Sequence, residues 1–242
     1  MPKKYDKFWV FGDSHTTPEY NVAPDKSFWG LVTTQCQVQE IINCSRPGNS
    51  FDTVCHLLVG SSKEINWQQD LVFIGIPPLE RITVFDNYKN TEYTGNRINT
   101  STWAVEKFDV SCHRGLECLQ HYGSDKELII HADRSWLETQ ILRQIFLLTQ
   151  WLDKMTANYM IINLAKSFDK NNVWGPSEGL LDYCIMHNRS ILFDRTYHSI
   201  NIDINRPVDY DAYGWHGHHG VDGNKLFFEE SLLPKLIDCN LI

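Results

Sequence analysis

The chain has 242 residues, of which 42% are hydrophobic, 21% charged and 12% aromatic, and this composition is typical of a globular domain. Its 22 basic and 30 acidic residues give a formal net charge of −8, which argues against a nucleic-acid partner because phosphate backbones bind basic surfaces. No secretory signal pattern begins the sequence, and no run of about 18 apolar residues is present to span a membrane. The cysteines number seven, without a Cys-x-x-Cys pair, which is typical of reduced thiols. We therefore expect a cytoplasmic protein with one domain over residues 1–242.

The first half of the chain alternates apolar runs with amphipathic segments. The apolar runs at residues 7–11, 40–44 and 70–75 predict buried strands. Residues 27–36 and 50–60 carry apolar side chains at helical spacing and predict the helices between those strands. A loop at residues 45–50 follows the second strand, and Pro77-Pro78 ends the third.

The second half opens with a segment that lacks helical periodicity. Residues 81–122 are rich in Thr, Asn, Tyr and Trp and predict an irregular insertion, with short strands or a lid as its form. A helix over residues 135–155, strands at 159–163 and 190–193, and a final helix over 222–237 follow. Strands alternating with helices predict an α/β fold, a three-layer α/β/α sandwich with a flavodoxin-like, mostly parallel sheet. The loops at the carboxyl ends of such strands gather in one crevice.

The clearest chemical signal follows the first predicted strand, where residues 12–15 are Gly-Asp-Ser-His. A serine at this place lies where α/β folds hold reacting groups, although an Asp-Ser pair after a strand also serves as a helix cap. Serine becomes a nucleophile when a base takes its proton, and histidine is the usual base. A glycine-rich loop before the final helix carries His216, His218 and His219, and each is a candidate for that base.

Three blocks in chain order resemble the SGNH/GDSL hydrolases. Gly12-Asp13-Ser14 matches the first block, Pro47-Gly48-Asn49-Ser50 matches the second, and His218 followed five residues later by Gly223 matches the last. The resemblance implies the α/β/α fold, with Ser14 as nucleophile and His218 as base. It also implies an oxyanion hole made by the N–H groups of Ser14 and Gly48.

The chain departs from the family's pattern at two places. The third block, usually Gly-x-Asn-Asp, is Gly75-Ile76-Pro77-Pro78 here, so the asparagine donor is absent. Trp215 stands where the family has an aspartate three residues before the histidine. We assign Asp211 as the carboxylate that orients His218, and a Ser-His pair without a carboxylate is the alternative.

Other polar residues near the expected crevice have both a functional and a structural interpretation. The candidate substrate contacts are Asp13, Asn49, Arg81, His216 and His219. A surface ion pair is the alternative for Arg81, and a helix N-cap is the alternative for Asn49, where both roles can hold at once. For His15 we expect a solvent-exposed or helix-start position, with substrate contact as the alternative. The three loop histidines also suit zinc, but no Cys-x-x-Cys or His-Glu-x-x-His motif accompanies them, so we expect no metal and no cofactor.

These patterns predict an enzyme of the serine esterase type. The expected reaction is hydrolysis of a small acyl ester through an acyl-enzyme. The resemblance, together with the aromatic insertion, implies a small-molecule or glycan substrate such as an O-acetylated carbohydrate. Aromatic residues of the 81–122 insertion, Tyr88, Tyr93 and Trp103, are candidates for stacking on a sugar ring, and ordinary packing within a lid is the alternative. The alternative is an SGNH-like fold that has lost catalysis and acts as a binding or structural module. The sequence leaves the oligomeric state open.

Overall fold

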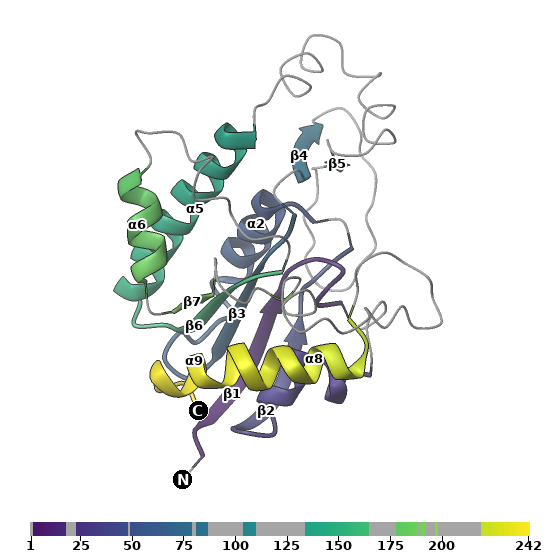
Figure 1. The fold of residues 1–242 in the computed structure, drawn as a ribbon, viewed down its shortest axis with the longest axis vertical. Helices are drawn as coiled ribbons and strands as arrows, with labels where there is room; N and C mark the ends of the chain where they lie inside the picture. Colours follow the sequence, from purple (N-terminus) through teal and green to yellow (C-terminus); the bar gives the residue numbers. More distant parts are fainter. Residues whose placement is uncertain are drawn as a thin grey trace.

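A parallel β-sheet forms the centre of the structure (Figure 1). The computed structural model describes residues 2–17, 23–47, 49–78, 81–86, 104–109, 134–164, 178–187, 189–191, 197 and 219–242. Within these ranges the sheet has five strands in the order β2-β1-β3-β6-β7, and each neighbouring pair is parallel. Their bounds are β1 Lys4–Phe11, β2 Gln37–Asn43, β3 Leu71–Ile76, β6 Asn158–Asn163 and β7 Ser190–Ile191. This strand order is that of a flavodoxin-like sheet, so the predicted fold class is confirmed.

Helices cover both faces of the sheet, and each face has its own apolar core. On one face lie α2 (Phe51–Ser61), α5 (Arg134–Lys154) and α6 (Glu178–Met186), and on the other α1 (Phe28–Val32), α8 (Val221–Phe227) and α9 (Leu233–Asp238). Every residue of β3 is buried, because its side chains alternate between the two cores. A continuous apolar run is the sequence pattern of such a strand.

The helices of the first half begin at serine caps. The Ser27 hydroxyl accepts the Gly30 N–H at 3.1 Å, and the Ser50 hydroxyl accepts the Thr53 N–H at 3.3 Å. A short 3₁₀ helix, Pro24–Lys26, precedes α1. The helix α1 ends at Val32 rather than at the predicted residue 36, because i→i+3 turns close the segment before β2 begins.

The C-terminal helix is interrupted by a wider turn. The helix predicted over residues 222–237 consists of α8, a π-helical turn over Phe228–Leu232 and α9. Pro234 has no N–H to offer to the carbonyl four residues before it, and the widened turn lies directly before this proline. The chain then ends beside the start of β1, where the Tyr5 hydroxyl donates to the Leu241 carbonyl at 2.7 Å.

The predicted insertion contains a pair of strands. Strand β4 (Arg81–Asp86) pairs with β5 (Ala104–Asp109) in antiparallel register, and the remainder of residues 81–122 lies outside the described ranges. Short strands were one of the two forms expected for this segment. The helix α6 was not predicted from the sequence. None of the described helices is long and apolar enough to cross a bilayer.

Candidate functional site

The Ser14 turn follows strand β1, which lies between β2 and β3, and is closed by hydrogen bonds onto one carbonyl. The Asp13 carbonyl accepts the Thr16 N–H at 3.1 Å, the Thr16 hydroxyl at 3.0 Å and the Thr17 hydroxyl at 2.9 Å. A Cβ added at Gly12 would lie 2.4 Å from the Thr16 hydroxyl oxygen. Glycine is therefore required at residue 12 because the turn folds tightly over it. Ser14 itself is 8% exposed at this turn.

Asp13 and His15 form a buried pair on either side of Ser14. The Asp13 carboxylate is completely buried, and its Oδ1 accepts the backbone N–H of His15 at 2.9 Å. The Nδ1 atom of His15 lies 2.9 Å from Oδ1 and 3.1 Å from Oδ2 of the same carboxylate. The expectation of a solvent-exposed His15 is wrong, because this pairing holds its ring inside the turn at 8% exposure. Asp13 was a candidate substrate contact, and in the structure its carboxylate is hydrogen-bonded to the backbone N–H and Nδ1 of His15.

The loop after β2 lies directly against the Ser14 turn. The Asn49 side-chain amide donates to the Gly12 carbonyl at 2.8 Å, and the Arg46 N–H donates to the same oxygen at 3.3 Å. Asn49 is fully buried, and the N-cap of α2 is Ser50, so the alternative of a helix N-cap at Asn49 is wrong. The first two predicted blocks thus meet in space. Gly48 lies outside the described residues.

The third predicted block ends strand β3 without a hydrogen-bond donor. Pro77 and Pro78 follow β3 directly, and neither has an N–H. A Cβ added at Gly75 would lie 2.3 Å from Leu164 Cδ1, so this glycine makes room for the residue that follows β6. Asn163, fully buried at the carboxyl end of β6, is a polar residue that the sequence analysis did not single out.

Tyr197 connects the Ser14 turn with the segment before the last helix. Its ring contacts the His15 ring edge-on at 5.6 Å between centroids and the His219 ring at 4.2 Å. His219 donates from Nε2 to the Tyr197 carbonyl, and it is only 3% exposed. Burial raises the pKa of the Tyr197 hydroxyl above its ordinary value, which keeps this group protonated as a donor to Asn224 Oδ1, 3.4 Å away.

Asn224 and Gly223 hold this segment in place. The Asn224 amide donates to the carbonyls of His219 at 2.7 Å and Gly220 at 3.0 Å, and its Oδ1 accepts the Phe28 N–H at 3.0 Å. A Cβ at Gly223 would lie 2.9 Å from the His219 Cβ. The glycine that matched the family's last block therefore leaves space for His219. Neither Tyr197 nor Asn224 was predicted, since isolated residues carry no periodic signal.

The remaining predicted site residues cannot be placed. Asp211, His216 and His218 lie outside the described ranges, as does the side chain of Arg81, whose backbone begins β4. Across the residues that are described, no group of three or more His, Cys, Asp or Glu side chains is arranged to hold a metal ion.

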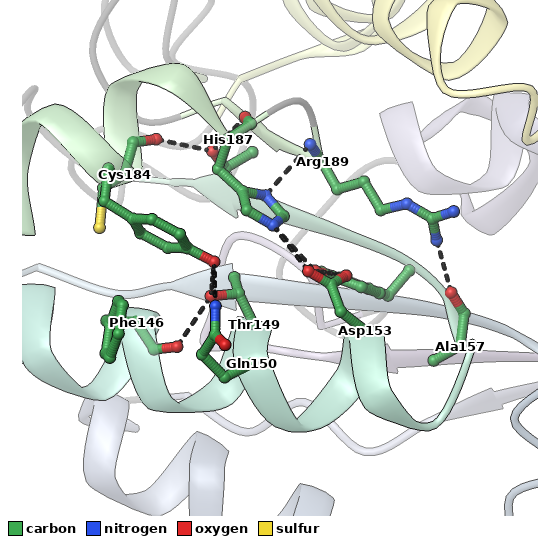
Figure 2. Close-up of polar contacts among 11 residues, drawn as sticks. Phe146, Thr149, Gln150, Asp153, Ala157, Cys184, His187 and Arg189 are labelled. Atoms are coloured by element: carbon green, nitrogen blue, oxygen red, sulfur yellow. Dashed lines mark hydrogen bonds and ion pairs between the residues drawn. The ribbon is translucent and has the colours of Figure 1, made fainter.

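A second histidine–carboxylate cluster lies beside the start of β6, at the end of the parallel sheet opposite to the Ser14 turn. Its polar contacts are drawn in Figure 2. His187 Nε2 lies 3.2 Å from Asp153 Oδ2, while its Nδ1 accepts the Arg189 N–H at 3.3 Å. The Tyr159 hydroxyl donates to the other Asp153 oxygen at 2.7 Å. Because Nδ1 is an acceptor, neutral His187 carries its proton on Nε2 and donates it to Asp153. These bonds tie the ends of α5 and α6 to the start of β6 and β7.

Comparisons with known proteins give matches in structure only. No protein-family model and no curated protein matches the sequence. A lipolytic protein of the G-D-S-L family from Veillonella parvula has a similar structure with a TM-score of 0.47, 12% identity and 96% coverage of both chains. A catalytic mutant of an acetylxylan esterase from Geobacillus stearothermophilus has a TM-score of 0.47 and 14% identity, over 97% of this chain and 95% of that one. The psychrotrophic esterase EstA from Pseudoalteromonas sp. has a TM-score of 0.42 and 10% identity, over 98% and 100%. Several solved structures that resemble this one are thus of GDSL-family proteins and esterases, at low identity and with modest TM-scores.

Proposed function

We propose that this protein is a serine ester hydrolase with Ser14 as its nucleophile. One observation carries the proposal: the Ser14 turn at the carboxyl end of β1 lies against the segment before the last helix, through the ring contacts of His15, Tyr197 and His219. This segment directly follows His216 and His218 in the chain. Acyl transfer needs a serine and a base, and the proposal brings one of these two loop histidines to the end of the sheet that carries Ser14.

The proposed reaction has two steps. His218 takes the hydroxyl proton of Ser14 while Oγ bonds to the ester carbonyl carbon, and the N–H groups of Ser14 and Gly48 stabilise the oxyanion. Collapse of this intermediate breaks the ester C–O bond, and His218 returns the proton to the leaving alcohol. Water, deprotonated by His218, then releases the acid from Ser14 by the same route. Asp211 orients the His218 ring.

His219 is a structural residue in this proposal. Its Nε2–H is donated to the Tyr197 carbonyl and its ring packs on that tyrosine at 3% exposure, so we assign His219 to holding Tyr197 rather than to taking the Ser14 proton. His218 and His216 are then left as bases. We assign His218, because Gly223 follows it at the spacing of the family's last block.

The oxyanion hole of this proposal has two donors rather than three. Pro77 and Pro78 offer no N–H after β3. One missing donor weakens transition-state stabilisation by about 3–4 kcal/mol. We therefore expect slow turnover, and we propose as substrate an ester whose alcohol leaves readily or is bound through other contacts. An O-acetylated carbohydrate is the first class to test, given the aromatic residues at 81–122.

A fluorophosphonate probe and p-nitrophenyl acetate test the proposal directly. Wild-type protein is expected to form a covalent phosphonyl adduct on Ser14 and to release nitrophenol, while Ser14→Ala does neither. Ser231→Ala is the control, because the Ser231 hydroxyl on the π-helical turn has no hydrogen-bond partner among the described residues. Wild-type labelling no faster than that of Ser14→Ala would contradict the hydrolase.

The same experiment decides the alternative of a non-catalytic module. The two prolines after β3 favour this alternative, because they remove a donor that acyl transfer uses. A folded protein that is unlabelled yet binds acetylated oligosaccharides in calorimetry would establish the binding module.

A further inference from the structure

The Asp13–His15 pair places a carboxylate next to the proposed nucleophile. Asp13 directly precedes Ser14 and is fully buried, so an ionised carboxylate at this position is shielded from water. Both of its oxygens lie within hydrogen-bond distance of His15 Nδ1, at 2.9 and 3.1 Å. An ionised carboxylate only accepts hydrogen bonds, so Nδ1 carries a proton and donates it to Asp13.

A buried negative charge beside Ser14 opposes ester hydrolysis. The oxyanion that forms when Ser14 attacks is also negative, and two like charges repel more strongly where water is excluded. The repulsion acts on the transition state, because the ground-state ester carries no such charge. A donor that faces the carboxylate, and is fixed there before the reaction, offsets the repulsion.

We propose that His15 is a positioning residue that compensates the Asp13 charge while the oxyanion forms on the Ser14 adduct, an inference that rests on the proposed hydrolase function. The backbone N–H of His15 holds Asp13 Oδ1 from the same residue, at 2.9 Å. The edge-on contact with Tyr197 holds the ring against rotation. The compensating donor is therefore built into the folded turn.

Two substitutions of similar shape separate this role from packing. His15→Asn keeps an N–H donor near the Nδ1 position, whereas His15→Leu has none. We expect His15→Leu to lower kcat for p-nitrophenyl acetate by roughly 10- to 100-fold per folded molecule, with KM within about twofold, because the lost interaction acts in the transition state. His15→Asn should recover most of that loss.

Replacing the Asp13 carboxylate with a neutral amide should make kcat independent of the His15 donor. In the double variant Asp13→Asn/His15→Leu, we expect kcat to recover by about tenfold or more over His15→Leu, since no buried carboxylate opposes the oxyanion. A packing role predicts no such recovery in kcat per folded molecule, because both variants lack the imidazole ring. Thermal unfolding and circular dichroism supply the folded fraction.

The following outcomes are decisive. Wild-type kcat in folded His15→Leu, or a double variant no faster than His15→Leu, would overturn the proposal. If His15→Leu does not fold, the comparison is made in the Asp13→Asn background, where the substitution must change kcat by less than about threefold. Labelling of wild-type Ser14 by the fluorophosphonate is measured in parallel. Its absence rejects the hydrolase function, whereas normal labelling with an unaffected His15→Leu rejects the role of His15 alone.

Discussion

Single hydrogen bonds join the separate loops of the candidate site. The Asn49 amide reaches the Gly12 carbonyl across 2.8 Å, and the Asn43 amide reaches the Thr16 carbonyl across 2.7 Å. Both acceptors belong to the turn that carries Ser14, while both donors come from β2 and the loop after it. The geometry of the nucleophile therefore depends on amide side chains that are distant in sequence.

Asn49→Leu should weaken the folded state. The substitution keeps the shape of the side chain and removes the donor to the Gly12 carbonyl, at an expected cost of about 1–3 kcal/mol in unfolding free energy. Urea denaturation measures this loss. Asn66→Ala is the control, since the Asn66 side chain makes its bond to Gln69 at the exposed surface. Equal stability of Asn49→Leu and wild type would show that the bond does not hold the turn.

His218 and His219 should respond differently to substitution. Replacing the base costs roughly 10²- to 10⁴-fold in rate, so His218→Ala should lose nitrophenyl-ester turnover with little change in unfolding free energy. His219→Ala removes a buried ring and should cost about 1–3 kcal/mol of stability, with a smaller loss of kcat per folded molecule. Turnover abolished in well-folded His219→Ala, with active His218→Ala, would contradict our assignment.

At the scale of elements, the side chain of Leu164, directly after β6, packs over Gly75 of the neighbouring strand β3. Gly75→Ala should destabilise the protein by about 1–3 kcal/mol, because the new Cβ would lie 2.3 Å from Leu164 Cδ1. The double variant Gly75→Ala/Leu164→Ala should relieve the clash and show coupling between the two positions. Urea denaturation of Gly75→Ala, Leu164→Ala and the double variant measures this coupling energy.

Gly60 in α2 provides the matched control. A Cβ there meets nothing within 4 Å, so Gly60→Ala should stabilise the helix by roughly 0.5–1 kcal/mol. If the unfolding free energy of Gly75→Ala were as high as that of Gly60→Ala, the contact with Leu164 would not be the reason that residue 75 is a glycine.

At the scale of the whole molecule, buried thiols couple folding to alkaline pH. Burial raises the pKa of Cys36 from 9.0 to about 11 and that of Cys184 from 9.0 to about 12. The folded state therefore favours the protonated thiols, and this stabilisation is complete below about pH 9, where unfolded thiols titrate, and is lost as pH rises through the folded values. Unfolding free energy should fall between about pH 9 and 11.

Urea titrations at neutral and alkaline pH, with a reductant present, measure this fall. Cys184→Ala removes one of the responsible groups and should lose less stability between the two conditions than wild type does, whatever its stability at neutral pH. An equal fall in both proteins would assign the effect to other groups.

The fold was predictable because its signals are local. The apolar run of β3, the serine caps of α1 and α2 and the alternation of strands with helices all lie within short windows of sequence. The helix α6 was missed and α1 was predicted too long, because helix ends depend on turns and packing as well as on periodicity.

Part of the candidate site was likewise predictable from local sequence, and part depends on tertiary contacts. The sequence by itself determined the Gly-Asp-Ser-His turn after the first strand, its place at the carboxyl end of a parallel sheet and the absence of a donor at Pro77. Only the tertiary structure decided three hydrogen bonds: the Asn49 amide to the Gly12 carbonyl, the buried His15 ring to the Asp13 carboxylate, and His219 Nε2 to the Tyr197 carbonyl. The physical reason is that turn chemistry is encoded in adjacent residues, whereas the partner of a buried polar side chain is set by which distant segments pack against it.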